Sequence, residues 1–158
     1  MTAEARPLCA YTDYGIDFLA TKVPGWGPSS KVERLDRDVP AFGLPREVMV
    51  ELYEQVPHPS CPYIPGVWDC ENFARWYAEH VAELWGRLVA KGKAPRGLLA
   101  QGAVLGKLPI GELPAGNHGA DFFFDDRNRY SMWEPQTRTL LSDSDVARCL
   151  ETWKLELH

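Results

Sequence analysis

The sequence lacks several features that mark whole classes of protein. It has no apolar run close to the roughly 20 residues that a membrane-spanning helix needs. It has no CxxC pair, and the spacing of Cys61 and Cys70 suits no zinc site. With 17 Lys and Arg against 22 Asp and Glu, the net charge is -5 and no basic patch stands out. We therefore expect no membrane span, no structural zinc and no nucleic-acid partner.

A secretory signal is missing as well. Residues 1–10 show no basic segment followed by an apolar one. We therefore expect a cytoplasmic protein, in the host cytoplasm or in a virion if the gene belongs to a phage. In that setting the four cysteines are expected to be free thiols rather than disulfides.

The composition that remains is that of one globular domain. The chain has 158 residues, of which 45% are hydrophobic and 25% charged, so we expect a single domain over residues 1–158. Thirteen Gly and 13 Pro indicate many loops, which favours an α/β or α+β fold over a helical bundle. Residues 1–44 are rich in Pro and Gly and are predicted to be mainly irregular, with a short strand near 31–35.

Apolar periodicity predicts the main elements. Helices are expected at residues 46–56, at 70–91, and from Ser142 or Ser144 onward through Leu150 and Trp153. Asp69 is the natural N-cap of the long central helix, which places Cys70 on its first turn. A buried strand is expected at 98–105, followed by a loop at 106–116.

Residues 117–136 read as a β-hairpin. A turn centred on Asp126 would pair Phe122 with Tyr130 and His118 with Glu134. A slip of two residues would keep the same apolar face, whereas a slip of one would split it.

Three polar residues form a candidate site. A thiol at a helix N-terminus, here Cys70, feels the positive end of the helix dipole. A histidine such as His118 could take its proton, and a carboxylate such as Glu134 could orient that histidine. The alternative is that each residue is structural, as isolated buried Cys and His residues usually are. Asp69 and Glu71, which flank Cys70, disfavour a thiolate unless a cation offsets them.

Three motifs in order resemble a known family. Trp68-Asp69-Cys70-Glu71-Asn72-Phe73-Ala74 is similar to D-C-[DE]-x-F-A, Asn117-His118-Gly119-Ala120-Asp121 resembles G-H-A-x-N, and Trp133-Glu134-Pro135-Gln136-Thr137 resembles E-P-Q-T-G. These motifs open the catalytic helix and two strands in the papain-like C-terminal domain of fungal ricin-type agglutinins and its stand-alone relatives in phages and bacteria.

The resemblance implies an α+β fold of papain-like type, with the catalytic helix packed on an antiparallel sheet. It implies a cysteine-dependent amide hydrolase, a thiol protease acting on a peptide or protein through an acyl-enzyme. Cys70 would be the nucleophile, His118 the general base and Glu134 the orienting acid of a catalytic triad. The fungal domains resemble calcium-dependent enzymes, so calcium is implied too, with Asp69 and Glu71 as candidate ligands.

Glutamines are candidates for support of an oxyanion. Gln101 and Gln55 could each donate a hydrogen bond, although a surface position is the better prediction for Gln55. Gln136 lies just beyond Glu134 and could hydrogen-bond within the site.

The chain departs from the family pattern at three positions, and two other functions stay open. Gly119 stands in place of Ala, Asp121 in place of Asn, and Arg138 in place of Gly. The first alternative is a non-catalytic binding module, such as a phage protein that blocks a host factor. The second is a transglutaminase-like acyl transferase, which uses the same three residue types in the same order.

Overall fold

The computed structural model describes residues 4–7, 13–34 and 39–158. Over these ranges it has four helices: α1 (Asp13–Ala20), α2 (Arg46–Gln55), α3 (Cys70–Ala90) and α4 (Asp143–Val146). It has nine strands: β1 (Arg6–Pro7), β2 (Trp26–Glu33), β3 (Ala41–Gly43), β4 (Leu98–Leu99), β5 (Gln101–Ile110), β6 (Leu113–Phe124), β7 (Tyr130–Glu134), β8 (Thr139–Leu140) and β9 (Glu151–Leu157). No helix of this part of the chain is long and apolar enough to cross a membrane.

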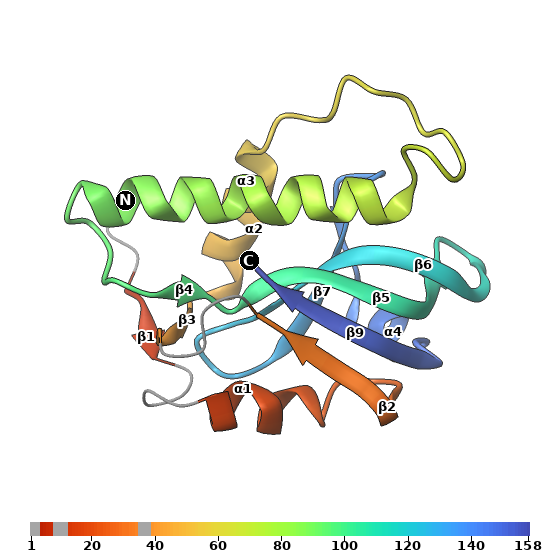
Figure 1. Ribbon diagram of the computed structural model, residues 1–158, viewed down its shortest axis with the longest axis horizontal. Coiled ribbons are helices and arrows are strands. Elements are labelled where there is room, and N and C mark those ends of the chain that lie inside the picture. The colour runs from red at the N-terminus through yellow and green to blue at the C-terminus, as the bar shows by residue number, and fades with distance from the viewer. Residues whose placement is uncertain (1–3, 8–12, 35–38) are drawn as a thin grey trace.

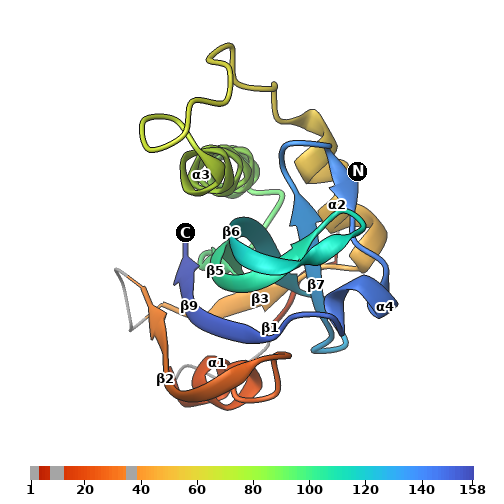
Figure 2. The same cartoon turned by 90° about the vertical axis from the view of Figure 1, so that its right-hand side faces the viewer.

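The strands form two sheets. The larger sheet has six strands in the order β2-β9-β5-β6-β7-β8, and the smaller has three in the order β1-β3-β4. Both are mixed, because β2 runs parallel to β9 and β3 runs parallel to β4. The large sheet lies between α3 on one side and α1 on the other (Figures 1 and 2).

Two buried clusters fill the two sides of this sheet. One cluster packs α1 against the sheet and includes Ile16 and Phe122. The other packs α2 and α3 against the opposite side and includes Tyr53, Tyr77 and Trp133. All five side chains are fully or almost fully buried. Burying a large apolar side chain of this kind contributes on the order of 2 kcal/mol to folding, so these clusters hold the helices on the sheet.

The central helix α3 begins as its sequence predicts. The Asp69 side chain accepts a hydrogen bond from the Glu71 amide at 3.2 Å, and the Asn72 side chain accepts one from the Asp69 amide at 3.1 Å. This reciprocal cap satisfies amides that the helix cannot pair internally. Asp69 is therefore confirmed as the N-cap, and Cys70 opens the first turn.

The predicted fold class is wrong. An α+β domain of papain-like type with a purely antiparallel sheet was expected, whereas more of the described residues lie in strands than in helices and both sheets are mixed. Both ends of the chain explain the difference. The described part of residues 1–44 contributes a helix and three strands, where mainly irregular structure was expected.

The C-terminal end is a strand rather than the expected helix. Helix α4 has only four residues, and Leu150 and Trp153 lie beyond it. Residues 151–157 pair with both β5 and β2 and bury Thr152, Leu155 and Leu157. The segment 106–116, predicted to be a loop, instead continues β5 and starts β6. In both cases pairing with a distant strand outweighs local sequence preference.

The hairpin of β6 and β7 is confirmed, but its register differs from the predicted one by two residues. Phe122 lies opposite Met132, and Phe124 lies opposite Tyr130. The turn is longer than expected because Asp125, which is fully buried, binds the amides of Arg127 and Arg129 at 2.8 and 3.0 Å. A shift of two keeps every side chain on its predicted side of the hairpin.

Candidate functional site

The hairpin places His118 and Glu134 next to each other. Continuing the observed register puts Glu134 opposite Ala120, so that His118 is its diagonal neighbour on the same side, which is still within reach of long side chains. His118 Nε2 and Glu134 Oε2 are 2.6 Å apart, and the two side chains are 5% and 9% exposed. The other carboxylate oxygen, Oε1, accepts a hydrogen bond from the Gln136 amide at 3.1 Å. Both oxygens of Glu134 are thus engaged, which holds the carboxylate in one orientation.

Helix α3 brings Cys70 to the same histidine. Cys70 lies close enough to the His118 ring to raise the pKa of that ring, and Nδ1 is the ring nitrogen that is not bonded to Glu134. A Cβ atom at Gly119 would lie 3.1 Å from the Glu71 backbone, so the missing side chain allows the start of α3 to lie directly on β6. Gly119, one of the departures from the family pattern, is therefore what permits the close approach.

The charges of the site favour a protonated His118. Burial alone would lower the pKa of this imidazole, but its hydrogen bonds to Cys70 and Glu134, and the negative charge of both, raise the pKa from its usual 6.5 to about 9. At neutral pH the ring is therefore an imidazolium ion. A cation in this position favours the thiolate form of a neighbouring cysteine.

The two carboxylates that flank Cys70 are already engaged. Asp69 caps the helix, and Glu71 forms an ion pair with Arg75 at 3.6 Å. Arg75 also makes a two-pronged contact with Glu156 at 2.9 and 3.0 Å. Within the described ranges, no three His, Cys, Asp or Glu residues gather in a way that could hold a metal ion. Asp69 and Glu71 as placed do not fit the expected calcium site, and the calcium expectation stays a prediction.

The candidate glutamines lie in three different places. Gln101 is fully buried and binds the Tyr53 hydroxyl and the Ala78 carbonyl, each at 3.0 Å, so it supports the core rather than the site. Gln55 lies on the surface of α2, as predicted. Gln136 adjoins the site, where its backbone N–H donates a hydrogen bond to Glu134.

Two hollows flank the three site residues and meet at Gln136. The Thr139 hollow, of about 420 Å³, is lined by His118, Glu134, Thr137, Thr139 and Asp145 among others. The Phe73 hollow, of about 260 Å³, is lined by His58, Pro59, Pro62, Tyr63 and Phe73 among others. A ligand that spans both hollows would pass over Gln136, beside Glu134. The Thr139 hollow is lined by residues of several strands and of α4, and the Phe73 hollow mainly by the loop between α2 and α3. No local motif in the sequence predicts either lining.

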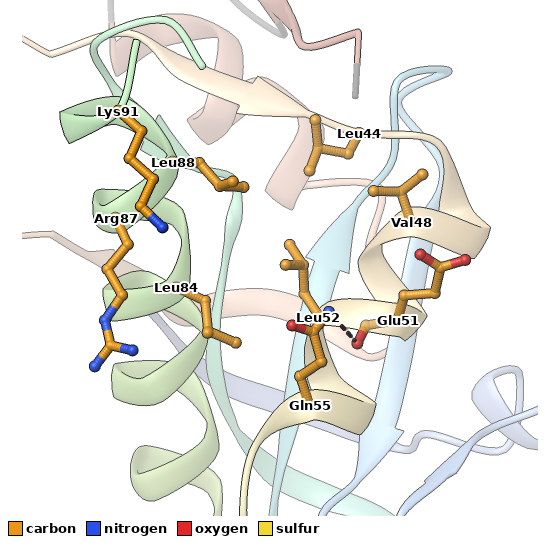
Figure 3. Close-up of a pocket in the computed structure, with 9 residues that line it drawn as sticks. All are labelled: Leu44, Val48, Glu51, Leu52, Gln55, Leu84, Arg87, Leu88 and Lys91. Carbon is orange, nitrogen blue, oxygen red and sulfur yellow. Dashed lines mark hydrogen bonds between the residues drawn. The ribbon is translucent and has the colours of Figure 1, made fainter. Parts of the chain in front are cut away.

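A further hollow lies away from this site, between α2 and α3. It has a volume of about 330 Å³. Figure 3 shows leucine side chains of both helices facing its interior, with Glu51 on α2 and Arg87 and Lys91 on α3. Its lining has no thiol, imidazole or hydroxyl group, so it offers mainly apolar surface and the charges of Glu51, Arg87 and Lys91.

Solved structures with a similar fold come from a lectin. No protein-family model and no curated protein matches this sequence. A complex of PSL1a with E64 aligns with 92% of this chain at 16% identity and a TM-score of 0.67. Polyporus squamosus lectin bound to the human-type influenza-binding epitope Neu5Acα2-6Galβ1-4GlcNAc aligns with 98% at 17% identity and a TM-score of 0.59. This chain covers 50% of each of those chains, and likeness at such low identity concerns the fold.

These comparisons correct several predictions. The chain was expected to be a papain-like cysteine peptidase domain, an amide hydrolase with peptide or protein substrates. The similar structures are lectins, one of them with a sialylated glycan bound, and this finding contradicts the predicted family, fold class, hydrolase function and peptide partner. The physical reason is that three short motifs specify local chemistry, while the topology around them depends on the segments at both ends of the chain.

Proposed function

We propose that this chain is a ligand-binding domain in which Cys70 is a nucleophilic thiol activated by His118. The observation that supports the proposal is the chain of contacts from thiol to imidazole to carboxylate, with 2.6 Å between His118 and Glu134. The His118 ring adjoins the thiol, and Glu134 orients the ring. The flanking hollows give a ligand room on both sides of Gln136.

The proposed step is a displacement at carbon. In the reacting form the Cys70 proton is already on His118, and a sulfur electron pair of the thiolate forms a C–S bond to an electrophilic carbon of the bound ligand. The leaving group departs with its bonding electrons and takes up the proton from His118. Glu134 stays charged throughout and keeps the imidazolium in place. The product of this step is a thioether.

The other described cysteines provide internal controls. Cys149 is 8% exposed, and burial raises the pKa of its thiol to about 11, so it is expected to be inert. Cys61 is partly exposed, like Cys70, but its thiol contacts only the Pro62 carbonyl. Cys70 and Cys61 thus differ mainly in the imidazolium ion, and their rates of alkylation isolate its effect. Cys9 lies outside the described residues and is replaced by Ser in these measurements.

The test is alkylation with iodoacetamide at pH 6, followed by peptide mass spectrometry. Because the His118 ring lies beside Cys70, Cys70 is expected to react at least about tenfold faster than Cys61. His118→Ala should bring the two rates together. If Cys70 and Cys61 react equally when His118 is present, the proposal is wrong. This comparison requires no change in the site itself.

Glycan binding is a second candidate function, favoured by the lectin structures with this fold. The Thr139 hollow offers hydroxyl and carboxylate groups of the kind that bind sugar hydroxyls, from Thr137, Thr139 and Asp145. Titration with Neu5Acα2-6Galβ1-4GlcNAc, followed by calorimetry, tests this candidate. We expect saturable binding that Thr139→Val weakens, and we expect prior alkylation of Cys70 to block it if the ligand crosses the site. Absence of binding at millimolar glycan would remove this candidate.

A further inference from the structure

We infer that the Phe73 hollow selects the ligand of the Cys70 site by taking an uncharged aromatic or branched apolar group. This inference rests on the proposed function, because it concerns what is attached to the carbon that Cys70 attacks. It is carried by the position, the rigidity and the chemistry of the hollow, each of which is visible in the described residues.

The position of the hollow follows from helix geometry. Phe73 lies three residues after Cys70, and residues with this spacing share a face of an α-helix. Gln136, which closes the other side of the hollow, donates its amide hydrogen to Glu134. The hollow is therefore anchored on both sides to the residues that hold the thiol and its histidine. A group of the ligand next to the reacting carbon would extend into it.

The rigidity of the hollow comes from the loop between α2 and α3. This loop runs from α2 above α3, passes beyond the N-terminal end of α3 and turns back to its first residue (Figure 1). Its tip is closed by reciprocal backbone hydrogen bonds between Ile64 and Trp68, at 2.7 and 2.8 Å. Gly66 adopts a positive φ of 71° that completes the turn. Because the backbone is fixed in this way, the wall of the hollow is preformed.

Aromatic contacts fix the floor. The ring of Phe73 contacts His58 at 5.5 Å on one side and Trp68 at 6.2 Å on the other, measured between ring centroids. His58 is in turn held by the Tyr77 hydroxyl at 3.2 Å. Because Phe73 is only 3% exposed, these packed rings hold the floor in place, and the aromatic surface open to a ligand is that of Tyr63 at the rim.

The chemistry of the lining excludes charged groups. Residues 56–68 contain no Asp, Glu, Lys or Arg, and the hollow is formed by prolines, Ser60, Cys61 and the aromatic residues. Tyr63 is 49% exposed at the rim although it is a large aromatic residue. A charged ligand group would lose water here and meet no Asp, Glu, Lys or Arg side chain of the lining, whereas an apolar ring would bury its own surface and that of Tyr63.

The test compares two alkylating probes of equal warhead chemistry, iodoacetamide and N-benzyliodoacetamide, on the Cys9→Ser protein. The ratio of their rate constants at Cys70 is divided by the same ratio for glutathione, which removes intrinsic reactivity. We expect the benzyl probe to be favoured by about three- to tenfold, the range that an aromatic contact supplies. A charged probe, N-carboxymethyliodoacetamide, should show no such advantage.

Two variants of the loop form a matched pair. Tyr63→Ser removes the aromatic rim and should reduce the benzyl advantage to near one. Val67→Ser makes a similar change on the same turn at a residue that is 70% exposed and does not line the hollow, and it should keep the advantage. If the benzyl probe has no advantage at Cys70, or if Tyr63→Ser leaves it intact, the inference is overturned. Failure of the proposed function shows differently, as equal iodoacetamide rates at Cys70 and Cys61.

Discussion

Each strand of the β6–β7 hairpin buries one carboxyl group, and these two groups have opposite surroundings. Glu134 meets the His118 ring at 2.6 Å and the Gln136 amide at 3.1 Å. Asp121, which is 0% exposed, has no hydrogen-bond partner on either oxygen among the described residues. It lies directly opposite Trp133, on the side of the hairpin that packs against α3.

The two groups show how the pKa of a buried carboxyl depends on whether it has a hydrogen-bond partner. Burial raises the pKa of Asp121 well above its usual 3.8, and the nearby charge of Glu134 adds to the effect. The fold therefore favours the neutral form of Asp121, whereas Glu134 lies beside the His118 ring. A buried carboxylate without a partner costs several kcal/mol, so the protein keeps the proton instead. Three substitutions of carboxyl groups or their partners test this explanation. They are given in order of decreasing expected change in the free energy of unfolding.

Glu134→Ala should have the largest effect. It leaves the buried imidazolium of His118 without its anion, and we expect a loss of about 3–5 kcal/mol in the free energy of unfolding at pH 6. Because the pKa of His118 is raised to about 9 in the fold, the stabilisation is fully present below about pH 6.5 and is lost as the pH rises through 9. Urea unfolding at pH 6, 8 and 10 measures this loss. A difference between wild type and variant that did not shrink with pH would contradict the pairing.

A surface carboxylate serves as the control for Glu134. Glu112 is exposed at the edge of the Thr139 hollow, and Glu112→Ala should change stability by no more than about 0.5 kcal/mol.

Asp121→Asn should act in the opposite direction. The raised pKa of Asp121 means that unfolding releases a proton above about pH 4, so this carboxyl lowers stability as the pH rises. The free energy of unfolding falls by at most about 1.4 kcal/mol per pH unit, until the pH reaches the pKa of Asp121 in the fold. The amide removes the slope, and the variant should gain on wild type between pH 4 and pH 8 in thermal or urea unfolding. Asp143→Asn, at a side chain that is 85% exposed, should show no gain, and parallel curves for wild type and Asp121→Asn would show that Asp121 is ionised in the fold.

Arg75→Gln should have the smallest effect of the three. Arg75 and Lys154 lower the pKa of Glu156 to about 2, so this carboxylate stabilises the fold above about pH 4.5 and loses its effect as the pH falls towards 2. Arg75 is 39% exposed, and with solvent screening we expect a loss of about 1 kcal/mol at pH 7. Arg87→Gln on the same helix removes a fully surface pair with Glu83 and should cost less. A loss for Arg75→Gln that was the same at pH 2.5 and pH 7 would exclude the ion pair as its cause.

Much of the centre of the chain was predictable from its sequence. Asp69 and Asn72 form a local cap, and the helix that follows has the expected apolar spacing, so α3 begins where predicted. The β6–β7 hairpin was predictable from alternation, and its two-residue shift came from the buried Asp125, whose bonds lengthen the turn. The proximity of His118 and Glu134 follows from the hairpin, whereas the approach of Cys70 depends on how α3 packs on β6. The chemical roles of the three residues remain the proposal made above.

The two ends of the chain were not predictable in this way. Residues 151–157 carry a helix-compatible pattern, and they become a strand because β2 and β5 offer edges on both sides. The lining of the Phe73 hollow depends on how a proline-rich loop folds back onto α3, and no spacing in the sequence encodes it. Asp121 stood out in the sequence only as a departure from a motif, and its isolation became visible once α3 covered it.

The sequence by itself determined the local elements whose stabilising contacts lie within a few residues, such as the cap of α3 and the side-chain alternation of the hairpin. The tertiary structure alone decided which strands pair, which carboxyl group receives a cation, and where the thiol meets its histidine. The reason is that local hydrogen bonds and periodicity act over one or two turns, whereas Gly119 lying against Glu71, and β9 lying between β2 and β5, are contacts between segments far apart in the chain.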